Sequence, residues 1–409
     1  MGTRMFEPSR RAVVAGLAGL PWLAAGQGAW AQAAASGQPV RIGQSLSLTG
    51  PLAQTGLIHK IVSEIFVAKT NREGGLLGRP IDYVLLDDQS KPDTARTLYE
   101  RLITSEKVDL IQGPYGTAAI LAAMGVAQRY KKLFIQCSLG LPELATYEWH
   151  FAATVGGAEA DHTFPVKLLE ALGSTGNPPK TVAVVTSKFP SAQRAGQGMK
   201  AIAEQRGLKV PLFLEYDFGT HEFGTIAARV KDADPDLLWV GALGVDGNLL
   251  LEALERVDYK PRRHFYLYPS SGPLAVLPAA DNALSVTNFE DVPPFTDSKE
   301  GGEFARLFRA AAETANLPYP HADSQAGYEY AGWQILTAAV NATKSFDDAK
   351  LAQWIETSEI DTVVGRRDFK GKWHNSSTDL QLLRQIQGKK WVAVWPADKA
   401  TPGVKLAAP

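Results

Sequence analysis

The chain has a single cysteine, Cys137, in 409 residues. This excludes an intramolecular disulfide and a zinc site built from several thiolates. The seven histidines are scattered, with no pair at helical or zinc-ligand spacing. The formal net charge is −1 and no block of like charge occurs, so nothing favours nucleic acid or an anionic membrane surface as a partner. We therefore expect no metal, no other cofactor and no nucleic acid.

Motifs of enzyme chemistry are also lacking. No Walker-type Gly-Lys-Ser/Thr and no G-x-S-x-G elbow occurs. Gly196-Gln-Gly198 lies inside a predicted helix, whereas a dinucleotide-binding turn directly follows its strand. Asp87 and Asp88 would point to opposite faces of a strand, so we interpret them as turn and capping residues. Cys137 with His162 as base would define an exported hydrolase, but an apolar thiol at a strand end is the favoured interpretation.

The N-terminus has the parts of a secretory signal peptide. Ser9-Arg10-Arg11 precedes a weakly apolar run from Ala12 to Ala25, and small residues follow up to Ala33. The arginine pair indicates the twin-arginine export route. The run is too short and too rich in glycine and alanine for a membrane anchor. We expect export to the periplasm, with cleavage after about Ala31 or Ala33.

Strand and helix patterns alternate along the rest of the chain in two series. Strands are predicted over residues 40–48, 81–86, 108–111, 132–137, 181–186, 210–215, 236–241, 264–268, 384–387 and 391–395. Helices are predicted over residues 59–72, 93–106, 118–127, 161–172, 191–206, 222–231, 246–257, 299–315, 324–343 and 347–358. This cadence indicates βαβ units and parallel sheets in two α/β lobes, with small ligands binding between them.

One stretch of the first series has the features of an anion site. The pattern predicts a buried strand from Val108 to Ile111, a turn at Gly113 to Gly116, and an alanine-rich helix after Thr117. Thr117 is a plausible N-cap of this helix. Backbone N–H groups, the hydroxyl and the helix dipole would together suit a carboxylate, although an ordinary capped βα turn remains an alternative.

Seven fragments in order resemble the branched-chain amino-acid-binding family of periplasmic solute receptors for ABC importers, from about Val40 to Pro396. They are Ile42-Gly-Gln-Ser-Leu-Ser-Leu-Thr-Gly-Pro51, Gly74-Gly-Leu-Leu-Gly-Arg-Pro-Ile81, Asp87-Asp88-Gln-Ser, Val108-Asp-Leu-Ile-Gln-Gly-Pro-Tyr-Gly-Thr117, Pro235-Asp236, Thr362-Val-Val-Gly365 with Asp368-Phe-Lys-Gly371, and Trp395-Pro396. Each fragment is weak alone, but the ordered set is specific.

The resemblance implies a two-lobed type I periplasmic-binding fold of class α/β, with three crossing strands and hinge closure on the ligand. Crossings are implied near residues 153–158, 287–294 and 364–370. The expected division is a signal peptide at 1–33, lobe 1 at 39–155 and 292–364, lobe 2 at 156–291 and 365–396, and a tail at 397–409. The implied protein is a monomeric, non-enzymatic receptor that delivers a small carboxylate to a membrane permease. A ligand sensor that regulates expression or signalling is the alternative.

The resemblance also implies ligand contacts from both lobes. The carboxylate would meet the glycine turn and the next strand end, and the rest of the ligand would meet loops of lobe 2. The expected residues are Leu48, Thr49, Tyr115, Gly116, Thr117, Cys137, Ser138, Leu139, Phe189, Leu243, Asp246, Tyr268 and Ser270. In amino-acid receptors an acid and a tyrosine hold the ammonium group. Here Glu159 or Asp246 could supply that charge, or each could be a solvated helix cap. Phe189 where a tyrosine might be expected and the apolar run from Cys137 to Leu141 suit an aromatic acid, so both ligand classes stay open.

Overall fold

A computed structural model of the chain describes residues 37–154, 160–269, 273–374 and 380–407. The predicted signal peptide lies outside the described residues, as do Glu159 and Ser270. The chain from Ala34 onward forms one compact unit.

The first sheet is parallel and has the strand order β2-β1-β3. A bridge between Gln112 and Ile135 connects it to a second parallel pair, β4-β5. The strands are β1 (Val40–Leu46), β2 (Ile81–Asp87), β3 (Leu110–Ile111), β4 (Phe134–Gln136) and β5 (His150–Ala152). The predicted anion-site turn therefore follows β3, beside the end of β4.

The second sheet has the order β14-β13-β10-β9-β8-β6-β7. Its strands are β6 (Thr181–Ser187), β7 (Lys209–Tyr216), β8 (Leu237–Gly244), β9 (His264–Pro269), β10 (Leu284–Thr287), β13 (Leu382–Gln387) and β14 (Lys390–Trp395). Strands β6 to β10 pair in parallel, and β13 and β14 pair antiparallel. Every residue of β8 is buried, which explains its nearly continuous apolar sequence.

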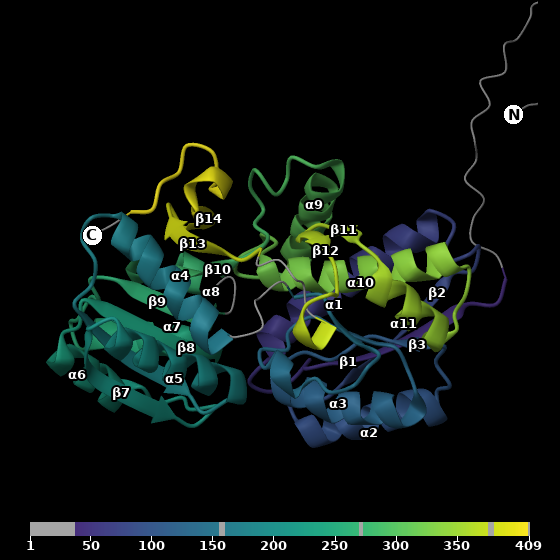
Figure 1. Cartoon of the computed structure of the whole chain (residues 1–409), viewed down its shortest axis with the longest axis horizontal. Coiled ribbons are helices and arrows are strands. Elements are labelled where there is room, and N and C mark those ends of the chain that lie inside the picture. The colour runs from purple at the N-terminus through teal and green to yellow at the C-terminus, as the bar shows by residue number, and fades with distance from the viewer. Residues whose placement is uncertain (1–36, 155–159, 270–272, 375–379, 408–409) are drawn as a thin grey trace, which may run out of the picture. The chain divides into compact units, whose positions relative to one another are not determined.

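Helices cover both faces of each sheet (Figure 1). On the second sheet, α4 (Ala160–Ser174) and α5 (Pro190–Gln205) share one apolar cluster. Helices α6 (Gly224–Ala233), α7 (Asp246–Arg256) and α8 (Pro273–Val276) share the opposite one. The alternation in β6 is consistent with this, because Val182 and Val184 belong to the first cluster and Ala183 and Val185 to the second.

The first sheet is covered by helices that come from distant parts of the chain. One cluster contains α1 (Ala53–Arg72), α9 (Lys299–Thr314), α10 (Ser324–Thr343) and α11 (Asp348–Thr357). The other contains α2 (Pro92–Thr104) and α3 (Thr117–Tyr130). The chain therefore leaves the second sheet after β10, builds α9 to α11 against the first sheet, and returns to the second sheet as β13 and β14.

The short hairpin β11 (Ile360–Thr362) and β12 (Gly365–Arg367) precedes that return, and Phe369 packs in the cluster of α9 to α11. The exact lobe boundaries remain predictions. No helix in the described ranges is long and apolar enough to cross a membrane.

The structure differs from the sequence prediction at several points, and the short elements β5, α8, β11 and β12 were not predicted. Helix α1 begins at Ala53, earlier than residue 59. Strand β10 was not predicted, because Leu284–Thr287 is only four residues long and includes two polar hydroxyl residues. Thr117 is the first residue of α3 rather than its N-cap, which is Gly116 with φ 88°. Only glycine adopts that backbone conformation readily.

Candidate functional site

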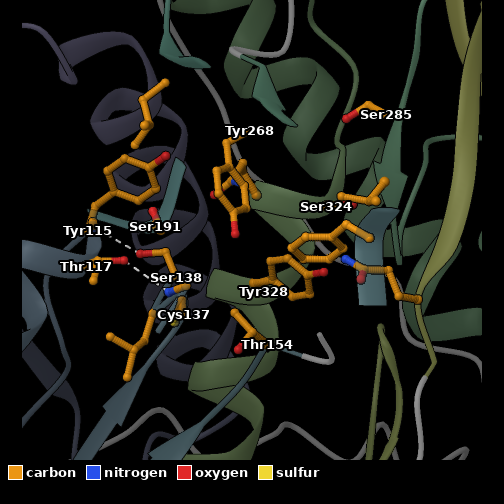
Figure 2. A pocket seen from close by; sticks show the side chains of 18 of the residues that line it. Tyr115, Thr117, Cys137, Ser138, Thr154, Ser191, Tyr268, Ser285, Ser324 and Tyr328 are labelled. Carbon is orange, nitrogen blue, oxygen red and sulfur yellow. Dashed lines mark hydrogen bonds between the residues drawn. The ribbon is translucent and has the colours of Figure 1, made fainter. Parts of the chain in front are cut away.

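A pocket opens where loops of the first sheet meet strand ends of the second, with about 850 Å³ of empty space that includes space open to solvent. Figure 2 shows Tyr115, Thr117, Cys137, Ser138 and Ser191 on one side of it, with Ser285, Ser324 and Tyr328 on the other. The described residues that line it are Tyr115, Gly116, Thr117, Cys137, Ser138, Leu139, Gly140, Pro142, Thr154, Phe164, Phe189, Ser191, Leu243, Tyr268, Ser285, Val286, Ser324, Gln325, Tyr328, Gln381 and Arg384.

Two loops of the first sheet are joined by a pair of reciprocal hydrogen bonds. The Gly116 N–H donates to Ser138 Oγ over 2.9 Å, and the Gly140 N–H donates to Thr117 Oγ1 over 3.0 Å. Each hydroxyl oxygen is thus an acceptor within the protein, so each retains its own hydrogen to donate. Neither hydroxyl donates a hydrogen bond to another group among the described residues. Two hydroxyl donors therefore lie side by side in the pocket wall.

The same wall carries the N-terminus of α3. The first N–H groups of a helix have no acceptor within it, and the helix dipole places partial positive charge there. The neighbouring loop is fixed by Gln136, whose Oε1 accepts from the N–H groups of Ser138 at 2.8 Å and Leu139 at 2.7 Å. This wall, which we call the hydroxyl wall (Gly116, Thr117 and Ser138), is rigid and rich in donors, as a carboxylate site requires.

The two sheets contact one another beside the pocket through an apolar cluster. Leu52 and Tyr115 of the first half pack there with Phe189 and Leu243 of the second. The two halves approach closely at Gly140, where an added Cβ would lie 2.5 Å from Ser191 Cβ and 3.0 Å from the Tyr268 hydroxyl. A side chain at Gly140 would therefore hold the two halves apart.

Tyr115 belongs to this contact and is held from behind by a buried network. Its ring lies 4.9 Å from that of His59, and burial raises the pKa of its phenol to about 12. His59 Nδ1 lies 2.8 Å from Glu329 Oε2, with both side chains 1% exposed. The network fixes the position of the Tyr115 ring without contributing a charged group to the lining of the pocket.

The opposite wall contains Arg384, the single charged side chain among the described residues that line the pocket. Its Nη1 donates to Glu290 Oε1 at 3.0 Å and to Asp323 Oδ2 at 3.3 Å, and its guanidinium lies 4.1 Å from the centre of the Trp391 ring. Burial raises the pKa of Glu290 to about 7, while Arg384 opposes that rise. Arg384 is therefore buried, held in one geometry and charge-balanced by neighbours.

Nine of the sequence-predicted site residues line the pocket. They are Tyr115, Gly116, Thr117, Cys137, Ser138, Leu139, Phe189, Leu243 and Tyr268. Their roles as ligand contacts stay predictions.

Leu48, Thr49 and Asp246 are not among the lining residues. Leu48 packs at the edge of the apolar cluster, and Thr49 is exposed and donates to Asp87 Oδ2 at 2.7 Å. Asp246 is not the solvated cap considered above, because it is 4% exposed and accepts from the Tyr216 hydroxyl at 3.1 Å. Burial raises its pKa to about 6. The structure thus gives this carboxylate a partner within the protein.

Sequence reasoning missed most of the wall around Arg384. Those residues come from α10 and β13, which the patterns predicted as a helix and a strand without a ligand role, and from β10, which was not predicted. A usable signal was Asp323, an N-cap residue that places Ser324 and Gln325 at the start of α10. Nothing local in the sequence places Arg384 beside them.

The site offers little for catalysis or metal binding. Burial raises the pKa of the Cys137 thiol well above its ordinary value, which disfavours the thiolate needed for nucleophilic attack. In the described part of the chain, no group of three His, Cys, Asp or Glu side chains is arranged to hold a metal ion.

Comparison with known proteins identifies the family of this chain. A sequence model described as periplasmic binding protein matches residues 39–390, which is most of the chain. The chain therefore belongs to the periplasmic binding protein family. The Leu/Ile/Val-binding protein of Escherichia coli K12 is 24% identical over 360 residues, which cover 81% of this chain and 90% of that protein.

Solved structures share the fold at lower identity. One is a solute-binding protein of an ABC transporter from R. palustris in complex with benzoate, with a TM-score of 0.75, 20% identity, and coverage of 90% of this chain and 98% of that one. Another is a leucine-binding protein from Thermotoga maritima, with a TM-score of 0.73, 16% identity, and coverage of 87% and 97%. At such identities the similarity establishes the fold, and the ligand has to be inferred from the residues of the site.

Proposed function

We propose that this protein is the substrate-binding component of an ABC transporter and that it captures a small carboxylate between its two halves. The observation that carries this proposal is the hydroxyl wall, where the hydroxyls of Thr117 and Ser138 lie beside the N-terminus of α3. The contacts across Gly140 and the shared apolar cluster support capture by closure of the two halves.

We further propose that the body of the ligand is an aromatic ring. Among the described residues, five aromatic side chains line the pocket, namely Tyr115, Phe164, Phe189, Tyr268 and Tyr328. The α-ammonium of an amino acid would instead need an acidic partner, since a buried unpaired charge costs several kcal/mol. The described residues that line the pocket include no acidic side chain for this role, and the carboxylates of Glu290 and Asp323 already pair with Arg384. A benzoate- or phenylpropanoid-type acid fits these groups better than an amino acid does.

The wider role follows the family. We propose export through the predicted signal peptide, action in the periplasm as a monomer, delivery to a membrane permease and no catalytic activity. The buried Cys137 thiol supports the last point, because its raised pKa disfavours an exported thiol hydrolase. A ligand sensor of the same fold remains the second candidate role, and loss of ligand uptake on deletion of the gene would distinguish transport from sensing.

A panel of matched ligands tests the binding proposal. Benzoate, cinnamate, leucine and the neutral amide benzamide would be added to the purified protein in thermal-unfolding experiments. A ligand at a hundredfold excess over its Kd stabilises the native state by about 2.7 kcal/mol. We expect the aromatic acids to raise the melting temperature and benzamide to leave it nearly unchanged. Stabilisation by leucine alone would contradict the aromatic ligand, and stabilisation by no carboxylate would contradict the receptor function.

A further inference from the structure

The wall of the pocket around Arg384 contains two buried donors without partners in the described part of the chain. Among the described residues, Ser285 Oγ and Arg384 Nε have no hydrogen-bond partner, although Ser285 is 0% and Arg384 2% exposed. Both residues line the pocket. Buried polar atoms are rarely left unpaired, and each such atom calls for an explanation.

These two atoms converge on the same region. Ser285 on β10 and Arg384 on β13 are directly paired in the antiparallel register, so their side chains leave the sheet on the same face. Figure 2 shows Ser285 across the pocket from Thr117 and Ser138, on the side of Ser324 and Tyr328. The unpaired donors therefore face a ligand from the end opposite the hydroxyl wall.

The other polar groups at this end are already engaged within the protein. Ser324 Oγ accepts from the Asn288 N–H at 2.9 Å and lies 2.8 Å from Thr287 Oγ1. The Tyr328 hydroxyl donates to Asn288 Oδ1. Ser285 and Arg384 thus supply donors at this end that no group in the described part of the protein engages.

The charge of the region restricts what those donors can bind. One guanidinium already faces two carboxylates, Glu290 at 3.0 Å and Asp323 at 3.3 Å. A second carboxylate on the ligand would be a third negative group around one cation, and like charges at such distances repel. A neutral oxygen meets no such repulsion and accepts from both donors.

We propose that Ser285 and Arg384 form a second subsite that recognises a neutral oxygen on the ligand, such as a phenolic hydroxyl, at the end remote from its carboxylate. The preferred ligand is then a hydroxylated aromatic acid rather than the unsubstituted acid or a dicarboxylate. This inference rests on the proposed function, because it takes the carboxylate to be held at the hydroxyl wall.

Calorimetric titration with matched ligands tests the subsite of Ser285 and Arg384. The probes are benzoate, 4-hydroxybenzoate and terephthalate, with cinnamate and 4-hydroxycinnamate as longer counterparts. We expect the hydroxylated acid of at least one length to bind about tenfold more tightly than its parent, as one or two added hydrogen bonds allow. Terephthalate should bind more weakly than 4-hydroxybenzoate. Equal affinity of parent and hydroxylated acids at both lengths would overturn the subsite.

Variants of Ser285 and Arg384 test whether these residues cause the preference for a hydroxylated acid. Ser285→Ala removes a hydroxyl that has no protein partner, so folding should be unaffected, and it should weaken the hydroxylated acid roughly 2- to 10-fold and leave its parent unchanged. Arg384→Lys keeps the charge opposite Glu290 and Asp323 but removes the Nε donor, so it should show the same selective loss. Ser191→Ala, on the opposite side of the pocket, should change both ligands by the same factor.

The outcomes separate the two proposals. Equal effects of Ser285→Ala on both ligands would overturn the subsite and leave the receptor function standing. Failure of every carboxylate to bind the wild-type protein would overturn both.

Discussion

Replacing Thr117 is the sharpest test of the hydroxyl wall. Thr117→Val has nearly the same shape, and the side chain is 1% exposed, so packing is retained while the hydroxyl is lost. Two interactions should then disappear. One is the hydrogen bond from the Gly140 N–H, at 3.0 Å. The other is the proposed donation to the ligand carboxylate.

The two losses have different sizes and appear in different measurements. Leaving the Gly140 N–H without its acceptor should lower the free energy of unfolding by about 1 to 3 kcal/mol. A hydrogen bond to a charged group contributes about 1.5 to 3 kcal/mol, so the Kd for the carboxylate should rise roughly 10- to 150-fold. The sequence alone gave no reason to expect the loss of stability, because it assigned Thr117 only to the helix cap and the ligand.

Thr117→Ser is the matched control. It keeps the hydroxyl and therefore both interactions, so its affinity should stay within a few-fold of wild type. Kd would be measured by calorimetry and unfolding by urea titration. The reasoning is refuted if Thr117→Val loses stability but binds the carboxylate as tightly as Thr117→Ser does, since the hydroxyl would then serve only the Gly140 N–H.

Three further predictions concern the contact between the two halves at Gly140, the loss of stability at low pH, and the buried pair of His59 and Glu329. Gly140→Ala places a Cβ 2.5 Å from Ser191 Cβ, so it should weaken ligand binding at least tenfold with little change in urea unfolding. Burial lowers the pKa of His150 to about 3, so below about pH 6.5 this histidine is protonated in the unfolded state but neutral in the folded state. The free energy of unfolding therefore falls as the pH drops below about 6.5. In His150→Phe, the loss of stability between pH 7 and 5 should be smaller by about 2 kcal/mol. Glu329→Gln breaks the buried pair with His59 and should cost about 3 to 5 kcal/mol of stability.

Matched controls separate each effect from a general loss of folding. Gly125→Ala lies in α3 with nothing near the added Cβ and should leave binding unchanged. His162→Gln and Glu64→Gln change exposed side chains and should leave the acid response and the stability near wild type. A Gly140→Ala protein that binds normally, an unchanged acid response in His150→Phe, or equal stability of the two glutamate variants would each contradict the corresponding reasoning.

The sequence predicted the part of the site that is local along the chain. A strand, a glycine turn and a helix follow one another between Val108 and Ala127, so the position of Thr117 could be inferred from neighbouring residues. The same holds for Cys137 and Ser138 at the next strand end. These segments line one wall of the pocket, and the βα cadence also predicted most helices and strands.

The opposite wall depends on contacts between distant segments and could not be predicted in this way. Ser285 and Arg384 become neighbours only through the pairing of β10 with β13, and β10 has no pattern that marks it as a strand. Asp246 is a second example. Its position at the start of a helix suggested a solvated residue, but in the structure Tyr216 at the end of β7 donates a hydrogen bond to it. Charge neutralisation of Arg384 by Glu290 and Asp323 is likewise visible only in three dimensions.

A crystal structure of the protein with a bound hydroxylated aromatic acid tests the central claim most directly. The account predicts that the carboxylate lies within hydrogen-bond distance of Thr117 Oγ1, Ser138 Oγ and the N-terminal N–H groups of α3, with the ring among the aromatic side chains. A carboxylate bound instead to Arg384, or a ligand bound outside this pocket, would contradict it.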